Sequence, residues 1–361
     1  MKSFMIVYFD LGIGGVQKKI INIVNHLAES QNYKDLPIYL LLETNKKFNL
    51  VDLISNHNVR IIYKKYRRVP LWLFILFNLF LYNPSTVLTF LPILSVYTLM
   101  VKHFFLFWRK MRIVVSEDII TTHSYKRGDF PSIFLERISK YFPQADSVIA
   151  PSPHVKQDLI DHFDIPENLV SIIPNWCKVS LLSNQKKETD LVYIGRLDPE
   201  KNLMTLLSIA LRLKEKTPNI KLWIIGEGKE GKKIASYIKN SHLDRNIKLL
   251  GPRKDIDLLL SKAKIAVITS TSEGMPLFIL EAMGYGLPVV AMECPGVNDL
   301  VLNNKTGFLC SSRDEFAGCV LKLLKDNHLR NNIGWRARKR AEKRYSGKNL
   351  DLLIDQLFDD Q

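Results

Sequence analysis

The chain is poor in cysteine, with four in 361 residues and no C-x-x-C pair among them. They are Cys177, Cys294, Cys310 and Cys319. Scattered cysteines in a chain of this length are typical of free thiols in a reducing compartment, because disulfide frameworks and thiolate metal sites need paired or closely spaced cysteines. The sequence therefore argues against disulfides and against metal bound by these cysteines.

We expect no signal peptide in the chain, and its sequence shows no internal repeat and no long apolar run. Its N-terminus, MKSFMIVYFDLGIGG, has too short an apolar stretch for a signal peptide, and it passes directly into a glycine-rich turn. The most apolar stretches, 71–82 and 96–108, are shorter than the roughly 20 residues with which a helix crosses a bilayer. We therefore expect a cytoplasmic protein without a transmembrane helix.

Basic residues are in excess, with 51 Lys+Arg against 36 Asp+Glu and a formal net charge of +15. This surplus favours encounters with phosphates, nucleic acid or an anionic membrane, although an ordinary soluble basic protein would have the same composition. The hydrophobic content of 47% is enough for large cores. The length predicts two domains.

Two segments far apart in the chain have the same order of strand, glycine-containing loop and helix. The first reads FMIVYF, DLGIGG, VQKKIINIVNHLAE, and the second reads DLVYIG, RLDPEKN, LMTLLSIALRLKEK. Other short apolar runs alternate with helical stretches: STVLTF, RIVVS, DSVIAP, VSIIPN, KLWIIGEG, NIKLLG, KIAVITS and GLPVVAM. This alternation predicts two α/β domains, each with a doubly wound parallel sheet. Ligands of such sheets bind beyond the carboxyl ends of the strands, so we expect the site in a cleft between the domains. The polar stretch 182–190 predicts the linker, with domains at 1–183 and 184–345.

A basic cluster precedes an aromatic-rich apolar run in YKKYRRVPLWLFILFNLFLY, residues 63–82. Lys64, Lys65, Arg67 and Arg68 stand directly before the run, which contains Trp72. A helix of this composition suits the interface of an anionic leaflet, where each cation contributes about 1 kcal/mol. A helix buried against the sheet is the alternative, and the sequence leaves both interpretations open.

The first glycine-containing loop has the spacing Gly12-x-Gly14-Gly15. Gln17 stands where a dinucleotide-binding fingerprint would have its last glycine, which argues against a dehydrogenase. What remains is a turn at a helix N-terminus, where backbone N–H groups and the helix dipole favour anions.

The second loop, GRLDPEKN, places Arg196 directly after a predicted strand and Lys201 near the start of the next helix. Two cations on one loop can clamp a diphosphate, the arginine through its planar fork and the lysine as a point charge. A solvated surface loop would also contain such residues, so the spacing alone leaves both readings open.

The stretch TSTSEGMPLFILEAMGYGLPVV, residues 269–290, places Glu273 in a turn after a predicted strand and Glu281 on the following helix. Pro276 suits the first position of that helix. The turn would expose backbone N–H groups at the helix N-terminus. These groups belong to Gly274, Met275 and Leu277. Glu273 can accept hydrogen bonds from ligand hydroxyls, and Glu281 can reach a vicinal diol such as a ribose, with a solvent-facing helix residue as the alternative for Glu281. Carboxylates for hydroxyls and cations for a diphosphate together describe a nucleotide-sugar site.

These pieces, taken in order, resemble the family 4 (group 1) retaining glycosyltransferases of GT-B fold. The matching segments include GIGGVQKKIINIVNHLAE, ADSVIAPSPHVKQDLI, VYIGRLDPEKNLMTLL, WIIGEG, LLGPRKDI and the stretch 269–290. The resemblance covers nearly the whole chain, and the GR…EK turn followed by E-x7-E is its most specific part. It implies two Rossmann-like domains facing across a cleft: an acceptor-side domain at 1–183, a donor domain at 184–345, and a C-terminal helix at 346–361 that crosses back to the first domain.

The resemblance also implies the chemistry, which is retaining transfer from a nucleotide-sugar, most often a UDP-sugar, with no required cofactor or metal. Arg196 and Lys201 would hold the donor diphosphate, and Glu273 would contact the donor sugar. The other implied donor-binding positions are Gly14, Gly15, Gly226, Gly228, Gly251, Pro252, Arg253, Gly274, Met275, Pro276, Leu277 and Glu281. We expect a lipid-linked or surface-polysaccharide acceptor at the cytosolic membrane face, with the membrane contact at residues 63–82.

One position departs from the family pattern. Many members have a histidine shortly after the strand that here reads RIVVS, whereas this chain has Glu117 and Asp118 there and His123 five residues later. His123 is the candidate for that catalytic role, and a surface histidine is the alternative. A catalytically idle binding protein with the same fold is the second hypothesis. Nucleic-acid binding through the basic stretch 336–348 is the third, and it is disfavoured because the sequence has no recognisable binding module.

Overall fold

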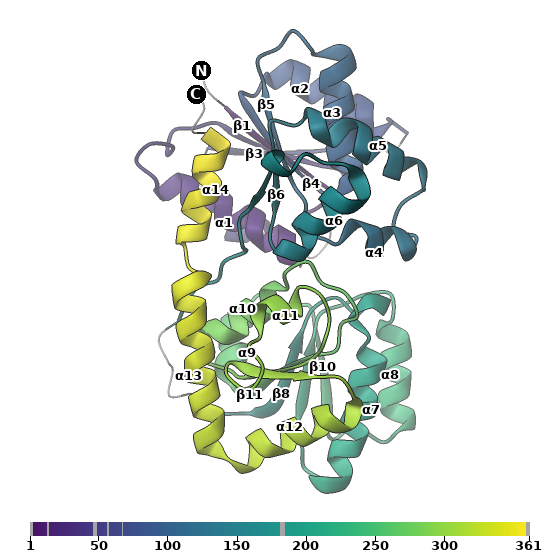
Figure 1. Ribbon diagram of the computed structural model, residues 1–361, viewed down its shortest axis with the longest axis vertical. Coiled ribbons are helices and arrows are strands. Elements are labelled where there is room, and N and C mark those ends of the chain that lie inside the picture. Colours follow the sequence, from purple (N-terminus) through teal and green to yellow (C-terminus); the bar gives the residue numbers. More distant parts are fainter. Residues whose placement is uncertain are drawn as a thin grey trace. The chain divides into compact units, whose positions relative to one another are not determined.

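The protein, seen here in a computed structural model, is described over residues 3–12, 14–45, 49–55, 58–66, 68–180 and 185–358. The chain divides into two compact units, which we describe separately. Unit 1 contains Met1–Pro174 and Leu350–Gln361, and unit 2 contains Asn175–Asn349. In each unit a parallel sheet lies between layers of helices (Figure 1).

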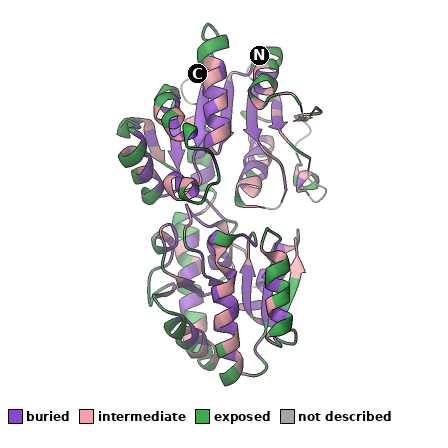
Figure 2. Ribbon diagram, turned by 90° about the vertical axis from the view of Figure 1, so that its right-hand side faces the viewer, coloured by how far each residue is buried: buried purple, intermediate pink, exposed green. Residues whose placement is uncertain are grey.

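Unit 1 is built on a seven-stranded sheet with the order β3-β2-β1-β4-β5-β6-β7. Its strands are β1 (Phe4–Tyr8), β2 (Ile38–Leu42), β3 (Val59–Tyr63), β4 (Thr86–Phe90), β5 (Arg112–Ser116), β6 (Ser147–Ala150) and β7 (Val170–Ile172). Every residue of β1, β4 and β6 is buried, as expected for a parallel sheet that helices cover on both faces (Figure 2). The strand order reverses between β1 and β4, which pair directly.

The helices of unit 1 alternate with these strands. They are α1 (Gly15–Glu29), α2 (Leu71–Tyr82), α3 (Pro92–Phe105), α4 (Thr121–Lys126), α5 (Ile133–Tyr141), α6 (Pro153–Phe163) and α14 (Lys348–Phe358), with the short 3-10 helices η1 (Val51–Leu53), η2 (Phe142–Gln144) and η3 (Glu167–Leu169). In α1 the apolar residues Ile20, Ile23, Val24 and Leu27 are buried, in agreement with their helical spacing. The helix α6 is capped by Ser152, whose hydroxyl accepts a hydrogen bond from the N–H of Val155 at 3.4 Å.

The last helix, α14, packs on unit 1 (Figure 1). The side-chain amide of Gln356 donates to the Ser147 hydroxyl at 2.9 Å, and Arg112 donates to the Gln356 carbonyl at 3.1 Å. The Phe358 ring meets the Phe4 ring edge-on with centroids 5.5 Å apart. These contacts tie the end of the chain to β1, β5 and β6.

Unit 2 contains a six-stranded sheet with the order β10-β9-β8-β11-β12-β13. Its strands are β8 (Thr189–Ile194), β9 (Leu222–Ile225), β10 (Ile247–Gly251), β11 (Ala263–Ile268), β12 (Val289–Met292) and β13 (Gly307–Cys310). Its helices are η4 (Pro199–Lys201), α7 (Leu203–Lys216), α8 (Gly231–Asn240), α9 (Ile256–Ser261), α10 (Leu277–Gly284), α11 (Val297–Leu300), α12 (Arg313–Lys325) and α13 (Asn327–Arg344). This strand order is that of a dinucleotide-binding Rossmann sheet, and the prediction of two doubly wound parallel sheets is confirmed.

The division between the units lies at Pro174 and Asn175, before the polar stretch 182–190 that the sequence favoured as linker. Asn175 belongs to unit 2 because its side-chain amide donates to the carbonyl of Met275 at 3.1 Å. The N–H of Cys177 donates to the carbonyl of Tyr345 at 2.8 Å, also within unit 2. Residues 181–184 lie outside the described residues.

Three strands, β2, β3 and β13, were not predicted from the sequence. Arg60 interrupts β3, which is only half-buried, so this strand lacks a continuous apolar run, whereas β2 and β13 are as long as strands that were predicted. β2 and β13 complete the sheets by pairing with β1 and β12. Their assignment therefore depends on neighbours that the local sequence does not contain.

Candidate active site

The sheet of unit 2 reverses its strand order between β8 and β11, which pair directly. The loops that follow two such strands leave the sheet in opposite directions and open a crevice beyond its carboxyl edge. Residues 195–202 follow β8, and residues 269–276 follow β11. The two most informative sequence motifs therefore lie at the position where this type of fold binds ligands.

Lys201 and Glu273, which are 72 positions apart in the sequence, meet at this edge. The Lys201 ammonium donates to both oxygens of the Glu273 carboxylate, at 2.7 and 2.9 Å. The Ser270 hydroxyl donates to the same carboxylate at 2.7 Å. The two side chains of the pair are only 16% and 10% exposed, so the ion pair is mostly shielded from water. This contact joins the two loops through their charged groups.

Backbone contacts hold the same two loops together. The Thr269 hydroxyl lies 3.2 and 3.0 Å from the carbonyls of Lys201 and Asn202, and the Thr271 N–H donates to the Glu200 carbonyl at 2.9 Å. Asn202 has a φ of 49°, in the left-handed region that asparagine tolerates better than most residues. This residue ends η4 and starts α7, and it fixes the direction in which Lys201 leaves the loop.

Arg196 lies beside this pair on the β8 loop, but its planar fork already has acidic partners. Its guanidinium donates to Asp198 at 2.7 Å and to Glu200 at 2.6 Å. The two carboxylates are mostly buried, whereas the Arg196 side chain is 57% exposed. The pairing presents the guanidinium at the surface of the loop in one fixed orientation, which the sequence spacing did not predict.

The glycine turn after β9 packs directly on the β8 loop. Gly226 has a φ of 133°, and a Cβ atom there would lie 2.0 Å from the carbonyl oxygen of Gly195. A Cβ atom at Gly228 would lie 2.5 Å from the backbone of Leu197. Only glycine lets the backbone of this turn come so close to the backbone of the β8 loop, so the turn after β9 packs tightly along one side of the crevice. The Gly226 N–H donates to the carbonyl of Gly251 at 2.9 Å, which brings the turn after β10 to the same edge.

The turn after β10 contains Gly251, Pro252 and Arg253. Gly251 has a φ of 64° with open space around the position of a Cβ atom. Arg253 donates from two nitrogens to the Asp255 carboxylate at 2.7 and 2.6 Å. Asp255 raises the pKa of the Arg253 guanidinium, and hydrogen bonding to Arg253 lowers the pKa of Asp255. The Arg253 guanidinium is therefore hydrogen-bonded to a carboxylate of its own loop, as is the Arg196 guanidinium.

The start of α10 differs by one residue from the prediction. Pro276 precedes the helix, with φ −70° and ψ 114°, and α10 begins at Leu277. The extended ψ angle at Pro276 places it outside the first turn. The N–H groups of Met275 and Leu277 have no hydrogen-bond acceptor among the residues that the structure describes. The Cβ position of Gly296 lies 2.3 Å from the carbonyl oxygen of Glu273, so a glycine there is needed to accommodate this turn.

Glu281 lies on α10 and is half-buried. Burial raises the pKa of the Cys177 thiol to about 12, with a further contribution from the charge of Glu281. The pKa of Tyr285 is raised by burial, and the charge of Glu281 adds to that shift. Glu281 thus lies close enough to two buried or half-buried neighbours for its charge to act on them, and its assignment to a ribose stays a prediction.

The remaining predicted residues, Gly14, Gly15 and His123, lie in unit 1. Gly14 precedes α1 with extended backbone angles, and Gly15 is the exposed first residue of that helix. The Lys18 N–H donates to the Gly14 carbonyl at 3.1 Å. His123 is half-buried on α4.

Sequence reasoning missed a buried polar cluster at the carboxyl end of β5. Lys19 of α1 donates to Asp118 at 2.8 Å and to the Ser116 hydroxyl at 3.1 Å, and the Ser116 hydroxyl donates to Asp118 at 3.0 Å. The side chains of Lys19 and Asp118 are 3% and 5% exposed. A lysine on the apolar stripe of α1 and an acidic pair directly after a buried strand were the available signals.

Glu117, between Ser116 and Asp118, is completely buried, and neither of its carboxyl oxygens has a hydrogen-bond partner among the described residues. Burial raises the pKa of Glu117 well above its ordinary value of 4.5, and the charge of Asp118 raises it further. The Ile119 N–H acts in the opposite direction without reaching hydrogen-bond geometry. The carboxyl group is therefore held toward its neutral form.

The described residues contain no group of three or more His, Cys, Asp or Glu side chains that could hold a metal ion. Of the helices that the structure describes, none combines the length and the hydropathy needed to cross a membrane.

Both units match family models of known proteins. Residues 180–340 match the family model described as glycosyl transferases group 1, and residues 13–180 match the model described as glycosyltransferase family 4. The poly(ribitol-phosphate) alpha-N-acetylglucosaminyltransferase of Staphylococcus aureus is 30% identical over 238 residues, or 65% of this chain and 47% of that protein. The N-acetylgalactosamine-N,N'-diacetylbacillosaminyl-diphospho-undecaprenol 4-alpha-N-acetylgalactosaminyltransferase of Campylobacter jejuni is 26% identical over 250 residues, or 66% of this chain and 67% of that protein. The matches span 45%, 47% and 42% of the first three curated relatives, about half of their length.

A crystal structure of HepE from Anabaena, in complex with UDP and glucose, has the same fold. It superposes with a TM-score of 0.83 at 19% identity, over 100% of both chains. The two α/β units therefore define a GT-B fold. With two adjoining family models matched from residue 13 to residue 340, the chain belongs to the group 1, or family 4, glycosyltransferases.

Proposed function

We propose that the protein is a retaining glycosyltransferase that moves a sugar from a UDP-sugar to a lipid-linked or surface-polysaccharide precursor at the cytosolic membrane face, without a required metal. The observation that carries this proposal is the Lys201–Glu273 contact at the switch point of unit 2. It brings a cation for the donor diphosphate and a carboxylate for sugar hydroxyls to one place.

The geometry of Lys201 suits a leaving diphosphate. A lysine ammonium has three N–H donors, and the two oxygens of Glu273 account for two of them. No other acceptor among the described residues contacts the Lys201 nitrogen, so a phosphate oxygen can take the third donor while Glu273 keeps its place. A fixed cation that faces the developing negative charge stabilises the transition state without reorganising during the reaction.

The surrounding groups extend the donor site. The N–H groups of Met275 and Leu277 point from the start of α10 and can bind phosphate or sugar oxygens. Arg196, held by its two carboxylates, offers a positive surface to the same diphosphate. Glu281 is assigned to the ribose hydroxyls, and the glycine turns at Gly226–Gly228 and Gly251–Arg253 to the nucleoside. In this proposal the third N–H of Lys201 and the N–H groups of Met275 and Leu277 are the hydrogen-bond donors to the departing diphosphate.

The donor and acceptor classes in this proposal are supported by relatives. HepE is bound to UDP and glucose, and the Campylobacter relative is named for a diphospho-undecaprenol acceptor. Unit 1 is assigned to the acceptor side, with Gly14 and Gly15 facing the donor diphosphate or the acceptor and His123 as the candidate catalytic residue. In the transfer, the bond from the anomeric carbon to the diphosphate oxygen breaks, a bond to an acceptor hydroxyl oxygen forms on the same face, and the hydroxyl proton passes to the departing diphosphate.

The membrane part of the proposal relies on an aromatic surface of unit 1. In α2 only Ile75, Asn78 and Leu79 are buried, so the buried-helix interpretation accounts for one side of this helix. The exposed large hydrophobic residues on α2 and at the end of α3 are Trp72, Leu73, Phe77, Phe80, Leu81, Phe104, Phe105, Phe107 and Trp108. We call this set the aromatic surface.

The two segments of the aromatic surface are joined. The Trp72 and Phe105 rings stack with centroids 5.9 Å apart, and the Arg109 guanidinium lies 4.6 Å from the centroid of the Phe80 ring. Large exposed apolar patches mark interaction sites, and aromatic rings beside cations suit the interface of an anionic bilayer. Arg67, which belonged to the predicted basic cluster, lies outside the described residues.

The chemistry is tested with the purified full chain. A panel of UDP-glucose, UDP-galactose, UDP-N-acetylglucosamine and GDP-mannose identifies the donor by thermal stabilisation. We then expect Arg196→Ala, Lys201→Ala and Glu273→Ala to lower turnover of that donor more than tenfold. Lys262→Ala is the matched control. The ion pair of Lys262 with Glu188, at 2.8 Å, lies at the amino ends of β8 and β11, away from the loops of the candidate site. Near-normal turnover in all three site variants would refute the site, and binding without turnover in the unmodified chain would identify an idle binding protein.

The stereochemistry and the membrane contact need separate measurements. NMR of the product gives the anomeric configuration, and inversion would contradict a retaining mechanism. Flotation with vesicles that contain anionic lipid tests the aromatic surface, where Phe77→Ser with Trp108→Ser should abolish binding. The control Leu258→Ser removes a large side chain that is 45% exposed on unit 2 and should leave flotation unchanged.

A further inference from the structure

Unit 2 has a second strongly charged feature, a groove between α13 and the loop that follows α11. Its volume is about 330 Å³. Six of the residues that line it are cations: Lys305, Arg336, Lys339, Arg340, Lys343 and Arg344. No acidic side chain is among its described lining residues. We call this feature the α13 groove.

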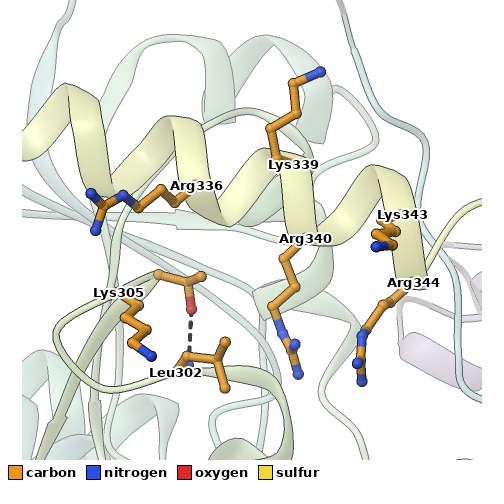
Figure 3. Close-up of a pocket in the computed structure, with 8 residues that line it drawn as sticks. Leu302, Lys305, Arg336, Lys339, Arg340, Lys343 and Arg344 are labelled. Atoms are coloured by element: carbon orange, nitrogen blue, oxygen red, sulfur yellow. Dashed lines mark hydrogen bonds between the residues drawn. The ribbon is translucent and has the colours of Figure 1, made fainter.

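The cations of α13 recur at the spacing of one helix face. Arg336, Arg340, Lys343 and Arg344 stand at positions i, i+4, i+7 and i+8. With a rise of about 1.5 Å per residue, Arg336 and Arg344 are about 12 Å apart along the helix axis, with Arg340 midway. Figure 3 shows the side chains of Arg336, Arg340 and Arg344 directed to the side of the helix where Lys305 lies, whereas Lys339 points away. The groove thus presents a row of positive charges at steps of about 6 Å.

One cation of the row has a structural role. Arg340 donates to the carbonyls of Leu300 at 3.1 Å and Asp299 at 2.9 Å, and it contacts the Tyr345 hydroxyl at 3.1 Å. These bonds hold α13 against α11. On the loop side, the N–H of Leu302 donates to the Thr306 hydroxyl at 2.9 Å, which fixes the opposite wall of the groove (Figure 3). Both walls of the groove are therefore held by hydrogen bonds within unit 2.

The other cations in the row have no internal use for their charge. Lys305, Arg336, Lys343 and Arg344 are exposed and form no ion pair within the described part of the chain. Like charges that are held this close repel one another and reduce the stability of the folded chain. A bound anion would remove that repulsion, and arginine forks bind phosphate oxygens in pairs.

The shape and the lining select among anions. A hollow accepts a single flexible chain, whereas a flat bilayer meets protruding side chains. Leu302 is the only large apolar residue among the described lining residues, and no aromatic ring is there on which a nucleic-acid base could stack. We propose that the α13 groove binds a linear polyanion with repeated phosphodiester groups and no bases. This site is separate from the donor residues, and it does not depend on the proposed transferase activity.

Binding of a fluorescein-labelled synthetic glycerol phosphate hexamer to the full chain, measured by anisotropy, tests this proposal. Four phosphate contacts predict a log–log salt slope of about −2.8, which is roughly a fiftyfold loss of affinity between 50 and 200 mM salt. The double variant Arg336→Gln with Arg344→Gln should weaken binding more than tenfold and halve this slope. The control Arg338→Gln with Lys348→Gln removes the same charge from residues outside the groove lining and should change affinity less than twofold.

Several results would overturn the inference. Equal losses in the two double variants would mean attraction by net charge alone. Equal or tighter binding of a dT hexamer would indicate a nucleic-acid site, and binding to anionic vesicles without binding of the hexamer would indicate a membrane contact. If the double variant fails to fold, as seen from its thermal unfolding, the single variant Arg344→Gln replaces it, and unchanged affinity there would refute the site. Lys201→Ala should keep full hexamer affinity, which separates this result from the outcome for the donor site.

Discussion

Replacing Lys201 by methionine tests the central contact of unit 2. The change keeps an unbranched side chain and leaves the Glu273 carboxylate, 10% exposed, with the Ser270 hydroxyl as its only donor among the residues that the structure describes. Removing one partner of a buried ion pair costs about 3–5 kcal/mol. Because both side chains retain some exposure and Ser270 remains, we expect about 2–3 kcal/mol. In a unit of this size each kcal/mol lowers the Tm by about 2–4 °C, so the transition of unit 2 should fall by about 4–12 °C.

Differential scanning calorimetry measures this shift, with Lys262→Met as the control. The Lys262 and Glu188 side chains are 23% and 48% exposed, so we expect the control to cost less than about 1 kcal/mol. In the Lys201→Met background, Glu273→Gln should recover part of the loss, because it removes the unpaired charge. Equal shifts for Lys201→Met and Lys262→Met would refute the reasoning that the site pair is shielded from water.

Three further predictions concern backbone shape and shifted pKa values. Gly226→Ala should cost more than about 3 kcal/mol, because its Cβ atom would lie 2.0 Å from the Gly195 carbonyl oxygen, whereas Gly251→Ala, with open space, should cost only about 1–2 kcal/mol. Urea unfolding compares them, and equal costs would contradict the clash. Because the pKa of Glu117 is raised in the folded state, its contribution to stability is present below about pH 4.5 and is lost as the pH rises toward the raised value, by up to about 1.4 kcal/mol per pH unit. Glu117→Gln should flatten this dependence in pH-dependent unfolding, and an unchanged slope would exclude Glu117 as its source. Burial raises the pKa of Cys294 to about 12, so iodoacetamide at pH 8 should modify it at least about a hundredfold more slowly than glutathione, and a similar rate would contradict its burial.

Much of the candidate site could be predicted because its motifs are local. A loop such as GRLDPEKN is recognisable from neighbouring residues, and the strand before it and the helix after it have their own periodicity. Lys201 and Glu273 were both selected in this way. The local pattern could not show that the Arg196 guanidinium is paired with Asp198 and Glu200, because a solvated surface loop and a diphosphate-binding loop contain the same residue types.

The buried cluster of unit 1 could not be predicted either, because its residues are far apart in the sequence. In the sequence, Lys19 is a single polar residue on the apolar face of a helix. Only the structure shows that it donates a hydrogen bond to Asp118, 99 positions away. Glu117 was read as a departure from a family pattern, and only its burial indicates a neutral carboxyl group. Ionisation depends on surroundings that come from several strands and helices, and no single window of sequence contains them.

The sequence by itself determined the two-sheet plan, the glycine turns and the identity of the charged residues, because hydrophobic periodicity and turn chemistry act over a few neighbouring residues. Tertiary structure decided which of them meet. The strand order sets β8 beside β11, and only that adjacency turns two motifs 72 positions apart into the Lys201–Glu273 pair. It also left the aromatic side of α2 exposed, and it placed Lys305 of the loop after α11 beside the cations that α13 carries at helical spacing, since contacts between separate elements follow from packing rather than from their order in the chain.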